Sequence, residues 1–140
     1  MMLDFTTTFR VRYGETDQSS FVFNGNYAAY YEIGRTAAIR AMGISYKEIE
    51  ERGVVMPLIY QNSRFHFPAF YDDLLTIKTS ILEMPKARIV FRYEIFNESG
   101  KKIHSGENAL AFIDKKTHRP LRAPNWFIEL LQKELDKQSN

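Results

Sequence analysis

The chain has 140 residues and a nearly balanced charge, with 19 Lys and Arg against 17 Asp and Glu. This length is enough for one domain with its own core, and the balance gives no overall attraction to nucleic acid or to a membrane surface. The absence of cysteine excludes thiol nucleophiles, disulfides and thiolate metal ligands, and it fits a reducing compartment. Because no apolar run approaches 18 residues and the start lacks a basic signal-peptide region, we expect a single cytoplasmic domain spanning 1–140.

The first predicted element is a strand over residues 5–13, in which Phe9, Val11 and Tyr13 alternate with polar residues. A long helix is predicted next, from Tyr27 to Gly43. Its small and aromatic residues recur at helical spacing and form one stripe: Tyr27, Tyr30, Tyr31, Gly34, Ala37, Ala38 and Ala41. Because most of these side chains are small, a sheet can approach the helix closely, so we expect strands to wrap around it.

The boundaries of the long helix are also predicted from residue types. The segment Asn24-Gly25-Asn26 precedes it, and an Asn side chain can cap free backbone N–H groups. Gly43 can adopt the left-handed conformation that ends a helix. We therefore expect the helix to begin just after an Asn cap and to stop at Gly43.

The rest of the chain is dominated by strands. The predicted elements are a short helix from a capping box at Ser45 to Gly53, strands over 56–67, 75–81, 89–95 and 102–113, a turn over 97–100, a polar loop over 114–119, a helix opening at Pro124 and a frayed tail over 137–140. This order predicts an α+β domain with a curved antiparallel sheet around the long helix. Such a sheet leaves an open edge, so we expect pairing with a second copy as a homodimer, or further association into a tetramer.

Few residues are candidates for chemistry. The three histidines, His66, His104 and His118, lack the spacing of a metal site, and no nucleophile elbow, phosphate loop or dinucleotide motif occurs. Two acids, Glu15 and Asp17, precede the long helix, whose N-terminus can stabilise a developing oxyanion. From the pattern alone these acids are as readily explained as helix caps or solvated loop charges.

A family resemblance favours the catalytic interpretation. The segments RYGETDQ (12–18), VFNGNY (22–27) and YEIGR (31–35), with GISY (43–46), Pro68, YDDL (71–74) and Arg119-Pro120, are together similar to the hotdog-fold acyl-CoA thioesterases of the 4-hydroxybenzoyl-CoA thioesterase type. The resemblance covers nearly the whole chain. It implies a hotdog fold, in which the sheet wraps the long helix, and hydrolysis of an acyl thioester to a carboxylic acid and free CoA at a dimer interface.

The resemblance also implies roles for individual residues. Asp17 matches the family's essential carboxylate, which acts as nucleophile or as general base on water. The backbone N–H of Asn24, with that of Gly25 beside it, would hold the oxyanion. No cofactor or metal is expected, because CoA is part of the substrate.

Substrate-binding candidates lie elsewhere in the chain. Tyr27 is a candidate at the start of the long helix. Lys86, Arg88 and Arg119 are candidates for binding the phosphates of CoA, because they lie beside predicted strand ends and loops. Met56 and Pro57, with nearby Phe residues, are candidates for lining an acyl pocket. Solvated loop charge and ordinary core packing are the alternatives.

Two departures from the family pattern leave other functions open. Asn24 stands where many relatives have His or an aromatic residue, and Ser19-Ser20 replaces a stretch that usually contains Gly. If a positive φ is needed there, Ser would strain the loop that carries Asp17. One alternative is therefore a non-catalytic module that binds acyl-CoA or an acyl carrier. A hotdog dehydratase is a third, although no His lies near Asp17 in the sequence.

Overall fold

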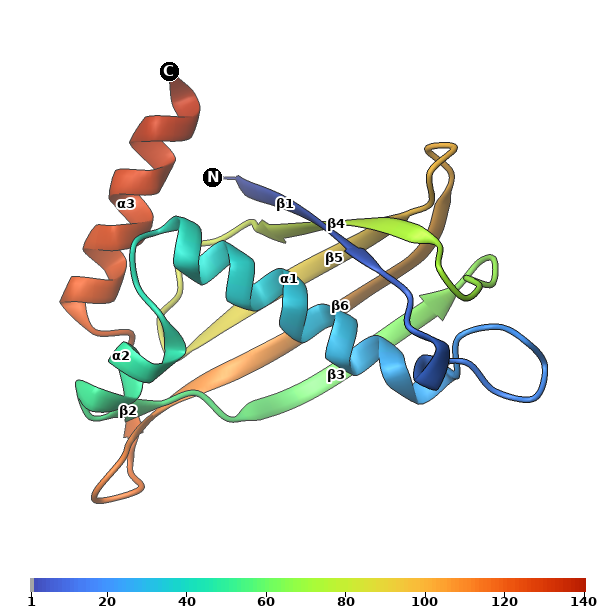
Figure 1. Ribbon diagram of the computed structural model, residues 1–140. Coiled ribbons are helices and arrows are strands. Elements are labelled where there is room, and N and C mark those ends of the chain that lie inside the picture. Colours follow the sequence, from blue (N-terminus) through green and yellow to red (C-terminus); the bar gives the residue numbers. More distant parts are fainter. Residues whose placement is uncertain (1) are drawn as a thin grey trace.

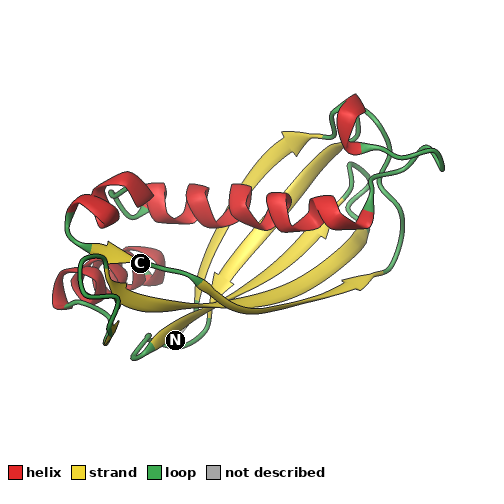
Figure 2. Cartoon of the chain, turned by 90° about the horizontal axis from the view of Figure 1, so that it is seen from below, coloured by secondary structure: helices red, strands yellow, loops and turns green. Residues whose placement is uncertain are grey.

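A long helix lies across one face of a curved antiparallel sheet in the computed structural model, which describes residues 2–140 (Figures 1 and 2). The elements, in chain order, are β1 (Leu3–Arg10), α1 (Tyr27–Ala41), α2 (Tyr46–Glu51), β2 (Val54–Val55), β3 (Leu58–Phe65), β4 (Leu74–Ile81), β5 (Arg88–Phe96), β6 (Lys102–Asp114), β7 (Pro120–Leu121) and α3 (Asn125–Ser139). Short 3-10 turns occupy Tyr13–Glu15 and Asn24–Asn26. No helix in the described part of the chain is long and apolar enough to cross a membrane.

The sheet follows the predicted meander. Strands β1, β4, β5 and β6 lie side by side in this order, and every pairing is antiparallel. The long strand β6 also pairs with β3 over most of its length and with β2 and β7 near its end. The predicted strand over 56–67 corresponds to β3, which is two residues shorter at each end, and the short strands β2 and β7 were not predicted.

Alternation along the strands explains which face the helix covers. In β5, Ile89, Phe91, Tyr93 and Ile95 are buried, whereas the residues between them are more exposed. In α1 the buried stripe is Tyr27, Tyr30, Tyr31, Gly34, Ala38 and Ile39. A Cβ on Gly34 would collide with the Thr79 hydroxyl, so this small residue permits the close approach of helix and sheet. The prediction was wrong for Ala41, which is exposed; Ile39 and Met42 are buried at this end of the helix.

Three predicted boundaries need correction. β1 ends at Arg10, so Tyr13 is not part of the strand and is 76% exposed. Asn26 stands at the N-cap of α1 without a side-chain cap bond, because its amide donates to the carbonyl of Glu15 instead. The predicted tail over 137–140 is wrong for most of its length, since α3 begins after Pro124 and continues to Ser139. The predicted endings of α1 at Gly43 (φ 92°) and of α2 at Gly53 (φ 87°), and the Ser45 cap of α2, are confirmed.

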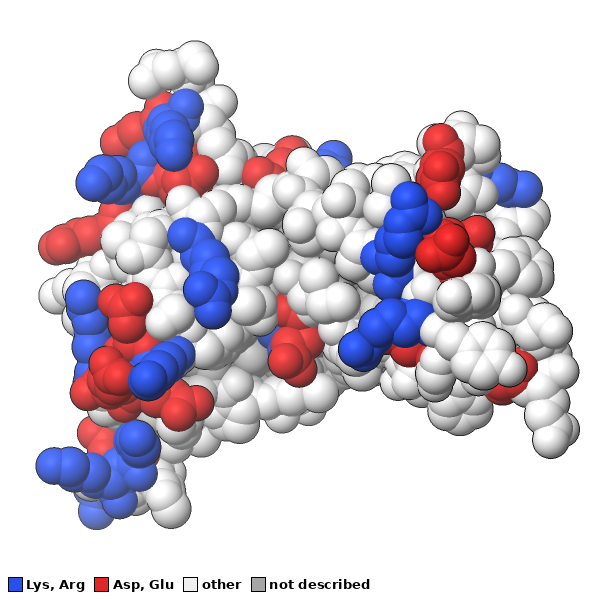
Figure 3. All heavy atoms as spheres, viewed as in Figure 1, with Lys and Arg blue, Asp and Glu red and all other residues white. Residues whose placement is uncertain are grey.

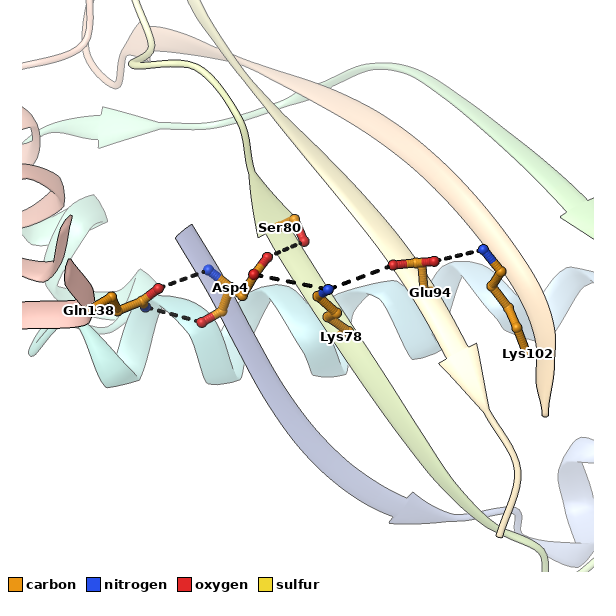
Figure 4. Close-up of polar contacts among 6 residues, drawn as sticks. All are labelled: Asp4, Lys78, Ser80, Glu94, Lys102 and Gln138. Atoms are coloured by element: carbon orange, nitrogen blue, oxygen red, sulfur yellow. Dashed lines mark hydrogen bonds and ion pairs between the residues drawn. The ribbon is translucent and has the colours of Figure 1, made fainter. Parts of the chain in front are cut away.

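The two edges of the sheet are treated differently. On β1, the side-chain amide of Gln138 from α3 donates to the carbonyl of Asp4 and accepts from its N–H, both at 3.0 Å (Figure 4). From Asp4 a row of charged side chains crosses the sheet through Lys78, Glu94 and Lys102 on β4, β5 and β6. Among residues 2–140, strand β3 pairs only with β6, and it is exposed on most of its length. The edge at Asp4 is therefore covered, and the edge at β3 is open.

Candidate functional site

The acidic loop before α1 is a short, closed hairpin. Thr16 and Val22 form an antiparallel bridge, and the N–H of Asp17 donates to the carbonyl of Phe21 at 3.0 Å. The N–H of Ser20 donates back to the carbonyl of Asp17, and Ser20 has a φ of 73°. The loop therefore keeps a left-handed residue, and a serine adopts the conformation that glycine would adopt without strain.

The loop is tied to the start of α1 through Glu15. Its carbonyl accepts the N–H of Phe23 at 2.9 Å and the side-chain amide of Asn26 at 2.7 Å. Its carboxylate accepts the Arg12 backbone N–H, pairs with the Arg12 guanidinium and accepts the Tyr30 hydroxyl. Burial, followed by the nearby carboxylate of Glu15, raises the pKa of Tyr30, so this hydroxyl stays a neutral donor. The Glu15 side chain is only 15% exposed, and it joins the loop to the helix.

Asp17 is placed quite differently from Glu15. It is exposed, and its carboxylate accepts one hydrogen bond, from the N–H of Ser19 at 2.8 Å. No Lys, Arg or His among residues 2–140 pairs with it. Of the two acids, Glu15 is engaged in holding the loop, whereas Asp17 keeps oxygen lone pairs that can accept a proton or attack a substrate.

The start of the helix supplies hydrogen-bond donors. The 3-10 turn at Asn24–Asn26 leads directly into α1, and the first N–H groups of such a turn have no partner within it. Among the hydrogen bonds of residues 2–140, none uses the N–H of Asn24 or Gly25. A Cβ on Gly25 would lie 2.7 Å from the ring of Phe23, so glycine lets this ring pack against the turn.

Tyr27 forms the inner wall of a small pocket beside this turn. The pocket measures about 220 Å³ and is also lined by Phe21, Asn24, Phe65 and His66 among others. The Tyr27 ring is buried, stacks on His104 with centroids 4.1 Å apart and meets Phe65 edge to face at 5.2 Å. Burial, followed by the nearby Tyr31, raises the pKa of Tyr27 to about 12. The ring is thus held rigidly with a neutral hydroxyl.

His104 supports this wall from the sheet. Its Nε2 lies 2.5 Å from the Tyr31 hydroxyl, which also contacts the Ser63 hydroxyl at 2.7 Å, and its Nδ1 has no partner among residues 2–140. Burial, followed by the proximity of His66, lowers the pKa of His104 to about 4, so it is neutral at pH 7. No local pattern in the sequence indicated this network, because its members lie on α1, β3 and β6. No group of three or more His, Asp or Glu in the described chain could share a metal ion.

The structure does not bring all predicted site residues together within one chain. Asp17, Asn24, Gly25 and Tyr27 lie around the start of α1. Met56 and Pro57 precede β3, whose far end meets Tyr27, and β3 spans about 23 Å at 3.3 Å per residue. Met56 is partly buried, Pro57 is exposed, and Arg119 is exposed in the loop before β7.

Lys86 and Arg88 are also remote from Asp17 in this chain. Arg88 pairs across the sheet with Ala111, whose N–H donates to the carbonyl of Pro57. Both basic side chains line a pocket of about 500 Å³ with Met84, Arg92 and other residues. Because Arg88 alternates with the buried Ile89, this pocket opens on the face of the sheet away from α1.

A comparison with known protein families shows to which family the chain belongs. The model of the thioesterase superfamily matches residues 20–104, which is more than half of the chain. The chain belongs to the thioesterase superfamily. This thioesterase is 31% identical over 130 residues to the acyl-CoA thioesterase YbgC of Helicobacter pylori, covering 87% of this chain and 96% of the relative.

Solved structures agree with the family. A DHNA-CoA thioesterase from Staphylococcus aureus matches with a TM-score of 0.87 and 30% identity, covering 97% of this chain and 91% of that one. The 4-hydroxybenzoyl CoA thioesterase from Pseudomonas sp. strain CBS-3 matches with a TM-score of 0.79 and 26% identity, covering 91% of this chain and 98% of that one. The hotdog fold and the family that the sequence motifs implied are confirmed.

Proposed function

We propose that this thioesterase hydrolyses acyl-CoA substrates to a carboxylic acid and free CoA, with Asp17 as the catalytic carboxylate. The relatives that it matches over most of its length are named as an acyl-CoA thioesterase, a DHNA-CoA thioesterase and a 4-hydroxybenzoyl CoA thioesterase. The observation that carries the proposal is the contrast between the two acids of the loop. Glu15 is committed to structural hydrogen bonds, while Asp17 is exposed in a loop tied to the free N–H groups of Asn24 and Gly25.

The reaction needs few groups. The thioester carbonyl would accept hydrogen bonds from the N–H groups of Asn24 and Gly25, aided by the positive end of the α1 dipole. Asp17 would either attack the carbonyl carbon and form a mixed anhydride, or remove a proton from an attacking water. In both routes the C–S bond breaks and the thiolate of CoA leaves, and water supplies the oxygen of the final acid. The loss of one oxyanion donor typically costs about 3 kcal/mol in the barrier.

The conformation of Ser20 favours an enzyme over a non-catalytic binding module. A serine in place of glycine could disrupt a loop that needs a positive φ. Ser20 nevertheless adopts a φ of 73°, and the hydrogen bond between Asp17 and Phe21 is kept. Strain of this kind costs on the order of 1–2 kcal/mol, which is small beside the stability of a domain. The loop therefore presents Asp17 despite the substitution.

We further propose that the active unit is a homodimer joined through β3. An exposed edge strand with unpaired backbone groups pairs readily with a second copy. In an antiparallel pair, the Leu58 end of one β3 lies beside the Phe65 end of the other. Met56 and Pro57 of the second copy would then approach Tyr27. Lys86, Arg88 and Arg119 of the second copy would come to the same end of the paired strands, where the phosphates of CoA can reach them. A cytoplasmic enzyme is consistent with a chain that lacks cysteine.

The test is release of free thiol from a panel of short, long and aromatic acyl-CoAs by wild type, Asp17→Asn and the control Asp72→Asn. Asp72 is an exposed residue of a turn with a φ of 68°, a conformation that Asn also tolerates. We expect Asp17→Asn to lower kcat at least about a hundredfold and the control to change it less than about threefold. Equal rates for wild type and Asp17→Asn, with both proteins folded and of the same oligomeric state, would refute the role of Asp17. Saturable acyl-CoA binding without turnover by wild type would instead support the binding module.

A further inference from the structure

Arg35 on α1 is a half-buried cation without a carboxylate partner. Its Nε donates to the Tyr46 hydroxyl at 3.2 Å and its Nη1 to the Tyr93 hydroxyl at 3.3 Å. No Asp or Glu of residues 2–140 lies within ion-pair distance of it. Burial raises the pKa values of both tyrosines, so their hydroxyls stay neutral. A buried charge is usually paired, and the remaining donors of this guanidinium are therefore available to a ligand.

Arg35 belongs to a chain of hydrogen bonds that reaches the open edge of the sheet. The Tyr93 hydroxyl donates to the side-chain carbonyl of Asn108 at 2.8 Å, and the Asn108 amide donates to Gln61 on β3 at 3.2 Å. Asn108 and Tyr93 are almost fully buried, whereas Gln61 is exposed. The network fixes the guanidinium on the side of α1 that faces β3.

This position lies in line with the proposed catalytic centre. Three side chains of β3 point to one face of the strand. Phe65 contacts Tyr27, and Ser63 contacts Tyr31. Gln61 accepts from Asn108, which belongs to the hydrogen-bond network that ends at Arg35. Four residues of strand span about 13 Å, and the eight residues of helix from Tyr27 to Arg35 rise about 12 Å. The two estimates agree, so α1 and β3 run together from the helix start to Arg35.

The space beside Arg35 is large enough for a ligand. A pocket of about 500 Å³ lies between α1 and α2, with Arg35 among its lining residues. The more exposed charges of this pocket largely cancel, because Arg40 and Lys47 stand against Glu32, Glu48 and Glu50. Acidic and basic side chains are mixed over the α2 end of the molecule (Figure 3). The middle of the same face is largely uncharged. Charges that cancel do not suit a polyphosphate, whereas a single guanidinium with free donors suits one anionic end of a ligand.

We propose that Arg35 is a specificity residue that binds a carboxylate at the far end of the acyl group, so that the preferred substrates are CoA thioesters of dicarboxylic acids. This rests on the proposed function, because the thioester is placed at the start of α1. A guanidinium matches a carboxylate in geometry and charge. The distance of about 12 Å corresponds to a chain on the order of ten atoms, from single bonds near 1.5 Å.

The first experiment compares kcat/KM for plain acyl-CoAs and for the matched ω-carboxylated acyl-CoAs, over roughly four to twelve carbons, a range set by that distance. In wild type we expect the carboxylate to raise kcat/KM about tenfold to a hundredfold near ten carbons, the range of a charge-assisted hydrogen bond. Arg35→Gln should remove this preference, mainly through KM, and leave plain acyl-CoAs within about threefold. Arg40→Gln, which removes an exposed cation of the same pocket, should keep the preference. No preference in wild type, or the same loss in both variants, overturns the proposal.

A second measurement needs neither hydrolysis nor a substituted protein, because it measures the binding of free acids to wild type. Inhibition or direct binding is measured with free decanedioate and with decanoate on the wild-type protein. We expect the diacid to bind at least about tenfold more tightly, and equal binding would overturn the proposal. Hydrolysis of all acyl-CoAs without any carboxylate preference would leave the proposed function standing and remove the inference. Preferential diacid binding without any hydrolysis would keep Arg35 as a carboxylate-binding residue and refute the proposed function.

Discussion

Replacement of His104 by Phe should make the protein less sensitive to acid. His104 is fully buried, stacked on Tyr27, and its Nδ1 has no partner in the described chain. Phe preserves the ring that stacks on Tyr27, and the Tyr31 hydroxyl keeps its bond to Ser63 at 2.7 Å. At pH 7.5 the loss of one hydrogen bond is offset by removal of an unsatisfied polar atom, so we expect a change in unfolding free energy within about 1 kcal/mol.

The pH dependence follows from the pKa of His104, which burial lowers from 6.5 to about 4. Because the unfolded chain binds the proton more readily, stability is fully present above pH 6.5 and is lost as pH falls toward 4. At about 1.4 kcal/mol per pKa unit, the whole effect is about 3 kcal/mol. Between pH 7.5 and pH 5, linkage gives a loss of about 2 kcal/mol from this residue.

The assay is urea unfolding of wild type, His104→Phe and the exposed control His118→Gln at pH 7.5 and pH 5. On acidification, the free energy of unfolding of wild type and of the control should each fall by about 2 kcal/mol more than that of His104→Phe. If wild type and His104→Phe lose the same amount, the burial of a neutral His104 does not govern acid stability and the reasoning is wrong. Chain concentration is kept constant, because association would itself change the apparent stability.

Two further substitutions test the loop and the network. Ser20→Gly should relieve the strain of the φ of 73° and stabilise the protein by up to about 1 kcal/mol, measured by thermal unfolding, without loss of thiol release. Ser20→Val should destabilise the protein, and stabilisation by Val would contradict the strained loop. Gly106→Ala should destabilise by about 1–3 kcal/mol, because its Cβ would collide with the Tyr31 hydroxyl, while Gly14→Ala, which meets no atom within 4 Å, should be nearly neutral; equal effects of the two alanines would contradict this packing.

The strands and helices were largely predictable because their patterns are local. The alternation of Ile89, Phe91 and Tyr93, and the small residues of α1, each report one buried face. The boundaries that failed depend on tertiary contacts. The helix α3 continues through 137–139 because Gln138 is held by the backbone of Asp4, more than a hundred residues away. Nothing in the local sequence signals this contact.

The site shows the same division. The position of Asp17 could be predicted because a motif carries it, and so could the glycine and asparagine at the helix start. The different states of Glu15 and Asp17 could not, because they depend on Tyr30 and Arg12 bonding to one acid and not to the other. The Arg35 network was equally hidden, since Tyr46, Tyr93 and Asn108 come from three separate elements.

The hydrogen bonds between Gln138 and Asp4 have a consequence for how many chains can join. A sheet with two open edges can add strands at both ends and grow into a fibre. Here a side-chain amide occupies the N–H and carbonyl of Asp4 on β1, so a strand that adds to this edge must displace two hydrogen bonds, whereas β3 is exposed on most of its length. Edge pairing is therefore favoured at β3 over β1, and a pair joined through β3 leaves only the less favourable edge for further addition. One glutamine near the end of α3 thus disfavours the addition of further strands at β1.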